Sequence, residues 1–224
     1  MFKKIIKYFL NAVLGEYFVF CRSRKSKGVA LTFDDGPHPE NTPLILKILK
    51  DRNIKATFFV LGSQIESCPE LTRQVLEDGH EFGNHSYDHI NIKRASWNEI
   101  YDSMSRTQKL IKHIGCTSPL KLFRVPYGLF NIKIFLFILR YGYILIHWTI
   151  DSRDSFNISE SDLCTYFDRH LFAHIQTGDI VLFHEDYLHT VQALPYILDQ
   201  LIKKGFHFMT VGKMLQERYC KTCK

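Results

Sequence analysis

Short apolar runs alternate with longer amphipathic segments between residues 29 and 211. Runs rich in β-branched and aromatic residues predict seven strands, at 29–34, 56–62, 81–86, 122–127, 143–151, 179–185 and 207–211. Helical periodicity between them predicts helices at about 42–52, 68–78, 96–114, 131–141, 159–174 and 190–204. Some strand runs, such as IVLF at 180–183, are apolar at every position, which is typical of parallel strands covered on both faces. The pattern predicts an α/β fold, namely a complete or incomplete (β/α) barrel in one domain.

The first 27 residues follow a different pattern. Apolar residues recur at helical spacing, namely Phe2, Ile6, Phe9, Val13, Tyr17 and Phe20. Lysines lie on the other side of the predicted helix. This predicts a basic amphipathic helix and a linker over 1–27. The apolar run 8–20 is interrupted by Asn11 and Glu16 and is shorter than the roughly 20 apolar residues that a membrane span needs. Two interpretations stay open: the helix binds a membrane surface, or it packs across one end of the domain.

The composition and net charge limit the domain count, the possible partners and the state of the cysteines. The 224 residues suffice for one α/β domain with a large core, and 46% of them are apolar. The net charge of +6 comes with no nucleic-acid-binding motif, so we expect no nucleic-acid partner. The six cysteines are expected to be reduced, because a chain of this size needs no disulfide framework. Neither the oligomeric state nor the role of Cys220 and Cys223 is predicted.

Ionisable side chains gather where the predicted strands end. Five strands end in or just before such residues, which are Asp34 and Asp35, His85 and His89, Arg124 and Tyr127, Asp151 and Asp154, and His184. Loops that follow parallel strands open on one face of a barrel, where active sites lie. The set therefore predicts an active site, although His184 alone also fits a core histidine and Arg124 a surface ion pair.

A metal site is predicted within this set. His85 and His89 lie four residues apart, so one helical turn would aim both imidazoles the same way. A carboxylate such as Asp35 would complete a two-His, one-carboxylate ligand set with open positions. A divalent cation would also offset the repulsion between the adjacent Asp34 and Asp35. Zinc suits this ligand set best, and cobalt, nickel, manganese and iron fit it as alternatives.

With these residues in view, the chain resembles the polysaccharide deacetylase family, which is carbohydrate esterase family 4 with a NodB-like domain. Five motifs occur in the family's order, which are TFDDGP at 32–37, HSYDH at 85–89, RVPYG at 124–128, DSRDS at 151–155 and VLFHE at 181–185. The ordered set is specific, whereas the HxxxH spacing alone would be weak. The resemblance implies a distorted (β/α)7 barrel, with the deacetylase domain at 28–216 and a tail at 217–224.

The resemblance also implies a role for each motif residue. Asp35, His85 and His89 would bind the metal, and Asp34 would act as the general base. The backbone N–H of Tyr127 would stabilise the oxyanion, and Leu182 would line the pocket for the acetyl methyl group. His184 would protonate the leaving amine. Asp154 would tune His184, with Asp151 as the alternative partner, and Arg124 would hold the acidic side of the site in place.

One position departs from the family pattern. The family places Trp after the second aspartate of its fourth motif, where this chain has Ser155. Phe156 and Trp148 are alternative substitutes for that wall, and a wider pocket would suit another acyl group or a lipid-linked amino sugar. The predicted activity is removal of N-acetyl groups from a glycan, with a non-catalytic glycan-binding module as the alternative. A membrane-associated or cell-envelope location is favoured over a cytoplasmic one.

Overall fold

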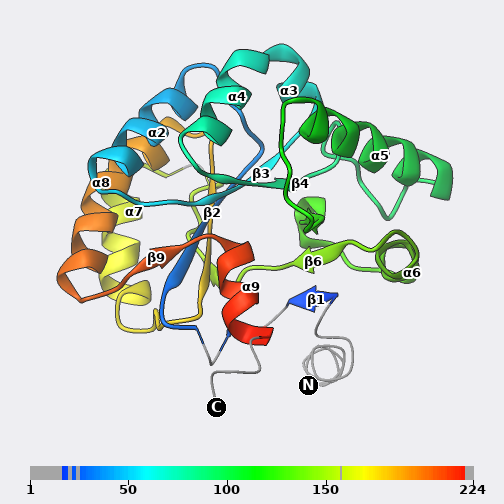
Figure 1. Ribbon diagram of the computed structural model, residues 1–224. Coiled ribbons are helices and arrows are strands. Elements are labelled where there is room, and N and C mark those ends of the chain that lie inside the picture. Colours follow the sequence, from blue (N-terminus) through cyan, green and yellow to red (C-terminus); the bar gives the residue numbers. More distant parts are fainter. Residues whose placement is uncertain (1–16, 20–21, 24–25, 157, 220–224) are drawn as a thin grey trace.

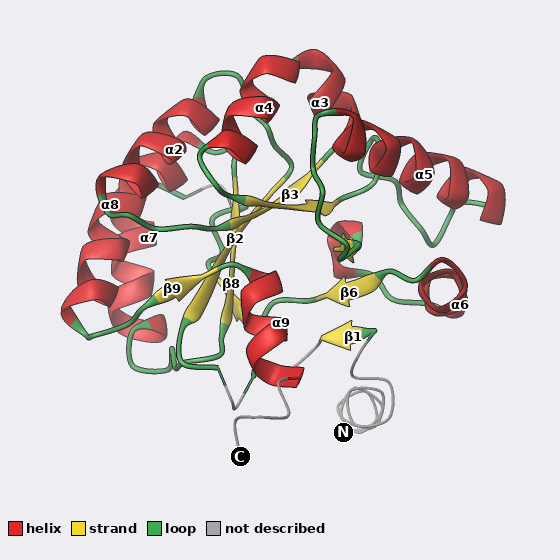
Figure 2. Ribbon diagram, viewed as in Figure 1, coloured by secondary structure: helices red, strands yellow, loops and turns green. Residues whose placement is uncertain are grey.

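The computed structural model describes residues 17–19, 22–23, 26–156 and 158–219. Its sheet lies at the centre, and helices cover its outside (Figure 1; Figure 2). The strands of the sheet are β1 (Phe18–Val19), β2 (Val29–Asp34), β3 (Thr57–Val60), β4 (Glu81–Asn84), β5 (Leu122–Phe123), β6 (Ile144–Ile146), β7 (Ile150–Asp151), β8 (Ile180–His184) and β9 (Phe208–Met209). They follow the order β1-β6-β5-β4-β3-β2-β8-β7, with β9 beside β2, and every pair is parallel.

The sheet curls into a half-barrel, which confirms the predicted barrel class. The predicted strand 143–151 is in fact two strands, because β6 pairs with β5 and β1 whereas β7 pairs with β8 at the other end of the sheet. The chain thus crosses the open side of the half-barrel between Ile146 and Ile150. His147 and Trp148 lie in this crossing.

The helices form the outer layer. They are α2 (Asn41–Asp51), α3 (Gly62–Ser67), α4 (Pro69–Glu77), α5 (Trp97–His113), α6 (Ile132–Tyr141), α7 (Glu160–Tyr166), α8 (Leu188–Lys203) and α9 (Val211–Tyr219), with the short turns η1 (Pro126–Gly128) and η2 (Phe167–Leu171). Helices α3 and α9 were not predicted. The predicted strand 207–211 stops at Met209, because α9 begins at Val211 and the Gly212 N–H donates to the Glu81 carboxylate at 2.9 Å.

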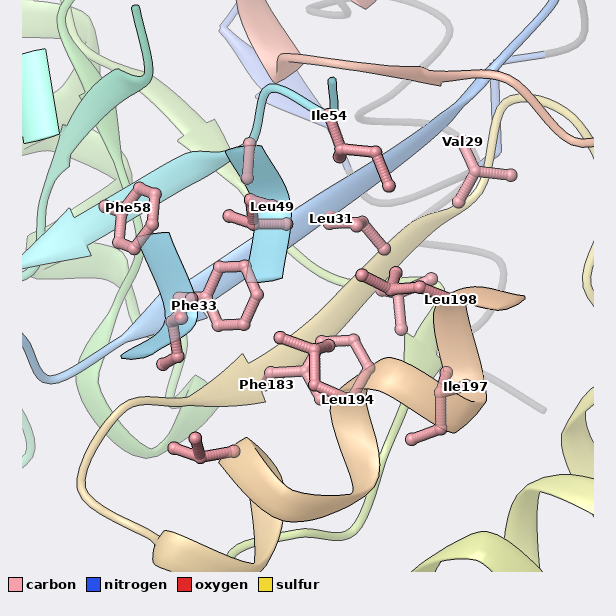
Figure 3. Packing of buried hydrophobic residues seen from close by; sticks show 14 of the residues in the cluster. Val29, Leu31, Phe33, Leu49, Ile54, Phe58, Phe183, Leu194, Ile197 and Leu198 are labelled. Atoms are coloured by element: carbon pink, nitrogen blue, oxygen red, sulfur yellow. The ribbon is translucent and has the colours of Figure 1, made fainter. Parts of the chain in front are cut away.

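The core between β2, β8 and α8 is built from aromatic and branched side chains (Figure 3). The Phe33 ring stacks on Phe58 at 5.1 Å and on Phe183 at 5.6 Å between centroids. Leu194 and Ile197 of α8 are fully buried in the same cluster. This packing fixes β2 and β8, the two neighbouring strands that end in Asp34 and His184.

The N-terminal prediction is corrected in part. We expected the helical spacing to continue to Phe20, but Phe18 and Val19 form β1, which pairs with β6 and becomes the edge of the sheet. A strand on an open edge satisfies backbone groups that would otherwise stay unpaired. Arg22 then binds Asp179 through Nε at 2.6 Å. The rest of the expected helix, in residues 1–16, lies outside the described residues.

Two further expectations concern the membrane and the thiols. Among the described residues, no helix combines the length and the apolar character needed to cross a membrane. Cys68, Cys116 and Cys164 are free thiols, as expected. The terminal pair Cys220 and Cys223 lies outside the described residues.

Candidate active site

The carboxyl ends of the strands surround a cavity of about 300 Å³. Its walls are formed by Asp34, Asp35, His85, His89, Val125, Tyr127, Gly128, Trp148, Asp151, Ser155, Leu182, His184 and Tyr187. Arg124 and Asp154 lie directly behind the wall and are buried. All the residues that the sequence singled out as candidates therefore meet in one place.

Asp34 is held by a buried arginine. The Arg124 Nη1 donates to Asp34 Oδ1 at 2.7 Å and to Thr32 Oγ1 at 2.7 Å. The guanidinium carbon also lies 4.1 Å from the centre of the Phe59 ring. Arg124 is only 1% exposed, so the interpretation as a surface ion pair is wrong. The charge of this buried arginine balances the charge of Asp34. The adjacent carboxylate of Asp35 therefore needs a different cation to balance its own charge.

Within the residues that the structure describes, Asp35 has no arginine or lysine partner of this kind. Its φ of 73° lies in the left-handed region, which costs an aspartate little compared with other residues. Its Oδ1 is buried without a hydrogen-bond partner among the described residues, and lies 3.5 Å from His85 Nε2 and 3.6 Å from His89 Nε2. Burial, helped by the neighbouring charge of Asp34, raises the pKa of Asp35 to about 7. Such a carboxylate needs a cation to remain ionised at lower pH.

The two histidines beside Asp35 favour the neutral form. Nδ1 of His85 donates to the backbone oxygen of Arg124 at 2.8 Å, which leaves the Nε2 lone pair directed at Asp35. Burial lowers the pKa of His85 to about 4, and burial also lowers the pKa of His89. One ligand atom from each of Asp35, His85 and His89 lies within 4.8 Å of the other two. A buried unpartnered oxygen between two neutral imidazoles fits a divalent metal ion.

The opposite wall carries a charged histidine. Nδ1 of His184 lies 2.8 Å from Asp154 Oδ1, and the His184 backbone N–H donates to Asp154 Oδ2 at 2.8 Å. Burial by itself would lower the pKa of His184. The hydrogen bond and charge of Asp154, with smaller contributions from Asp34 and Asp35, outweigh burial and raise it to about 9. The alternative partner Asp151 instead accepts from the Arg153 N–H at 2.9 Å.

Known proteins match this chain in sequence. The family profile described as Polysaccharide deacetylase matches residues 22–145. A peptidoglycan-N-acetylglucosamine deacetylase of Bacillus cereus is 37% identical over 202 residues, which cover 86% of this chain and 90% of that protein. The chain belongs to the polysaccharide deacetylase family.

Two further proteins are similar to this polysaccharide deacetylase family member, one in sequence and one in structure. A chitooligosaccharide deacetylase of Azorhizobium caulinodans is 30% identical over 209 residues, covering 87% of this chain and 97% of that protein. The solved structure of the peptidoglycan deacetylase PdaC from Bacillus subtilis superposes with a TM-score of 0.77 at 31% identity, covering 86% of this chain and 92% of that one. The half-barrel is thus the fold of the family.

The position where this polysaccharide deacetylase family member departs from the motif lies at the cavity. Ser155 lines it, whereas the neighbouring Phe156 is 59% exposed and is not part of the wall. Trp148 lines the cavity and packs on Gly128 so closely that a Cβ on this glycine would lie 2.7 Å from the indole ring. Of the two substitutes named from the sequence, Trp148 is the one at the site.

Sequence reasoning missed three residues that support the site. Thr190 Oγ1 donates to Asp154 Oδ2 at 2.9 Å, and His189 Nε2 lies 2.6 Å from the Asp154 backbone oxygen. Glu185 is buried against Gly36, which has no room for a side chain, and burial raises the pKa of Glu185 to about 8. The signal for Glu185 was its place beside His184, and Thr190 and His189 open α8 shortly after that strand end.

Proposed function

We propose that this protein is a metal-dependent hydrolase that removes N-acetyl groups from amino sugars of a glycan. The observation that carries the proposal is the buried Oδ1 of Asp35, which lies between the imidazoles of His85 and His89 and has no hydrogen-bond partner in the described part of the chain. Zinc is the metal that this ligand set favours. The names of the relatives support peptidoglycan or chitooligosaccharide as the substrate class, and a lipid-linked amino sugar carries the same acetamido group.

Asp34 would be the general base. A bound divalent ion supplies Lewis acidity, which polarises the amide carbonyl and makes water more acidic. Asp34 belongs to the same strand end as Asp35, but its Oδ1 is engaged by Arg124. Arg124 therefore fixes the orientation of the carboxylate, so that Asp34 can accept the proton of the attacking water.

His184 would be the general acid. An amine leaves an amide readily only when its nitrogen is protonated, and a His184 with a pKa of about 9 holds a proton at neutral pH. Asp154 keeps the ring in place through Nδ1, so that the proton is held at Nε2. Tyr127 and Leu182 both line the cavity. The backbone N–H of Tyr127 would stabilise the oxyanion, and Leu182 would contact the acetyl methyl group.

The basic amphipathic pattern of residues 1–16 supports a further part of the proposal. We propose that this segment binds a membrane surface and brings the protein to a substrate at the cell envelope. The alternative function, a non-catalytic glycan-binding module, would need the loss of a ligand or of the base. Asp34, Asp35, His85, His89 and His184 are all present and meet in one cavity, which favours the enzyme.

The two adjacent aspartates provide the test. Asp35→Asn should lose bound zinc, measured by atomic emission after dialysis, and should lose acetate release from chitooligosaccharides and peptidoglycan fragments. Asp34→Asn should keep the zinc and lose the turnover. Equal zinc loss in both variants would contradict the assigned roles. Absence of acetate release by zinc-loaded wild type from every substrate, with chelator-resistant glycan binding, would favour the binding module.

A further inference from the structure

Helix α6 carries an apolar face on its outside. Ile132, Leu136 and Leu139 follow each other at helical spacing and are 66%, 50% and 37% exposed. The inner face, with Ile134 and Phe137, is buried in the core. A helix that lies on a protein surface normally presents polar residues to water, and a helix that is apolar on all sides is normally covered on all sides. The outer face of α6 therefore fits an apolar environment better than water.

The charged residues of α6 itself are all positive, and the one nearer the outer face at its end is Arg140, since Lys133 Nζ donates to the Ala95 backbone oxygen at 2.7 Å. Helix α6 contains Lys133 and Arg140 and no acidic residue. Among the described residues, no carboxylate lies within ion-pair distance of Arg140, whereas the exposed Arg106 binds Glu66 at 2.8 Å. Apolar residues flanked by basic ones are the pattern of segments that lie on anionic lipid surfaces.

The position of α6 connects this face to the N-terminal segment. The Phe18 ring of β1 stacks on Phe135 of α6 at 5.3 Å between centroids, and β1, β6 and α6 lie on the same side of the molecule (Figure 1). The chain reaches β1 from residues 1–16, the segment whose sequence is basic and amphipathic. Both features thus join the molecule at one edge.

The first turn of α6 lies close to the cavity in the chain. Gly128 lines the cavity, and α6 begins only four residues later, at Ile132. We propose that Ile132, Leu136 and Leu139 of α6, together with Arg140, dock on an anionic lipid surface and hold the cavity entrance beside it. The proposal rests on the membrane-surface part of the proposed function and deepens it, because it favours an amino sugar presented at the lipid surface as the substrate.

The test is co-sedimentation of full-length, zinc-loaded protein with vesicles of phosphatidylcholine, with and without phosphatidylglycerol. A triple variant, Ile132→Ser, Leu136→Ser and Leu139→Ser, should bind anionic vesicles at least tenfold more weakly than wild type. Arg140→Gln should weaken binding to anionic vesicles only. The matched control is the double variant Leu44→Ser and Ile202→Ser, which changes residues that are 45% and 43% exposed on α2 and α8. This control should bind as wild type does.

The outcomes separate this proposal from the one it rests on. Absence of vesicle binding by wild type would overturn both membrane proposals, whatever the acetate release. Equal vesicle binding by wild type and the triple variant would overturn the role of α6 alone. A wild-type dimer in light scattering that the triple variant abolishes would assign the face to a second copy. Stronger vesicle binding after deletion of residues 2–16 would assign the face to that segment. Unchanged acetate release from soluble chitooligosaccharides shows that the triple variant is folded.

Discussion

Two histidines on opposite walls of the cavity make the same hydrogen bond and reach opposite protonation states. Nδ1 lies 2.8 Å from an oxygen in both His85 and His184. The oxygen is the neutral backbone carbonyl of Arg124 in the first case and the carboxylate of Asp154 in the second. The pKa is lowered by burial to about 4 for His85, whereas for His184 the charge of Asp154 overcomes burial and raises it to about 9.

The difference assigns different chemistry to the two walls. A neutral imidazole with a free Nε2 lone pair is a metal ligand, and a protonated imidazole is an acid. Burial is common to both histidines, so the charge of the hydrogen-bond partner decides between these roles. The comparison can be tested by changing the charge or the neighbours of that partner.

The largest effect is expected for Asp154→Asn. This change removes the charge but keeps the size of the side chain, so the pKa of His184 should fall and less of it should be protonated at neutral pH. Loss of a general acid typically costs about 10²- to 10⁴-fold in rate. The basic limb of the pH–rate profile should move to lower pH, while the bound zinc stays unchanged. Asp151→Asn is the control, and it should leave the basic limb in place. A basic limb that does not move in Asp154→Asn would show that the charge of Asp154 does not set the state of His184.

A second prediction concerns the effect of Asp35 on the free energy of unfolding when no metal is bound. The pKa of Asp35 in the folded protein is about 7, above the ordinary value of 3.8. The folded state therefore binds this proton more tightly than the unfolded state, and stability falls as the pH rises from about 4 to 7. In the presence of chelator, Asp35→Asn should increase the free energy of unfolding at pH 8 by up to about 4 kcal/mol and change it little at pH 4.

Urea unfolding at both pH values measures this effect. Zinc should stabilise wild type at pH 8 and should not stabilise Asp35→Asn, because the variant lacks one ligand. Equal stabilities of the two proteins at pH 8 in chelator would mean that Asp35 has another compensating partner, and the metal site would lose its main support.

The sequence predicted most of the site, because its residues follow strands that were easily recognised. A buried run such as 29–34 ends in Asp34 and Asp35, and parallel strands bring such ends together. The sequence favoured Asp154 as the partner of His184 but left Asp151 as an alternative, since the choice depends on the conformation of a loop in which Arg153 has a φ of 61°. The neutral partner of His85 is the backbone oxygen of Arg124, and a backbone partner cannot be identified from residue types in the sequence.

The limits of the fold prediction lie at the edges of the sheet. Strand β1 has only two residues, too few to show an alternating pattern, and the helical spacing of its neighbours concealed it. The run 143–151 looked like one strand because the crossing between β6 and β7 contains the aromatic Trp148. Helix α6 was predicted correctly, but its apolar residues on every side did not indicate which face would be exposed.

The smallest effect is expected for Thr190→Val. The Thr190 Oγ1 donates to Asp154 Oδ2 at 2.9 Å, so the variant removes one hydrogen bond and keeps the charge of Asp154. The free energy of unfolding should fall by about 1 kcal/mol, the usual cost of a buried hydrogen bond. Because the charge beside His184 Nδ1 remains, the basic limb of the pH–rate profile should stay where it is in wild type. A shift of the basic limb as large as that of Asp154→Asn would mean that the position of the Asp154 side chain, rather than its charge, makes the pKa of His184 differ from that of His85.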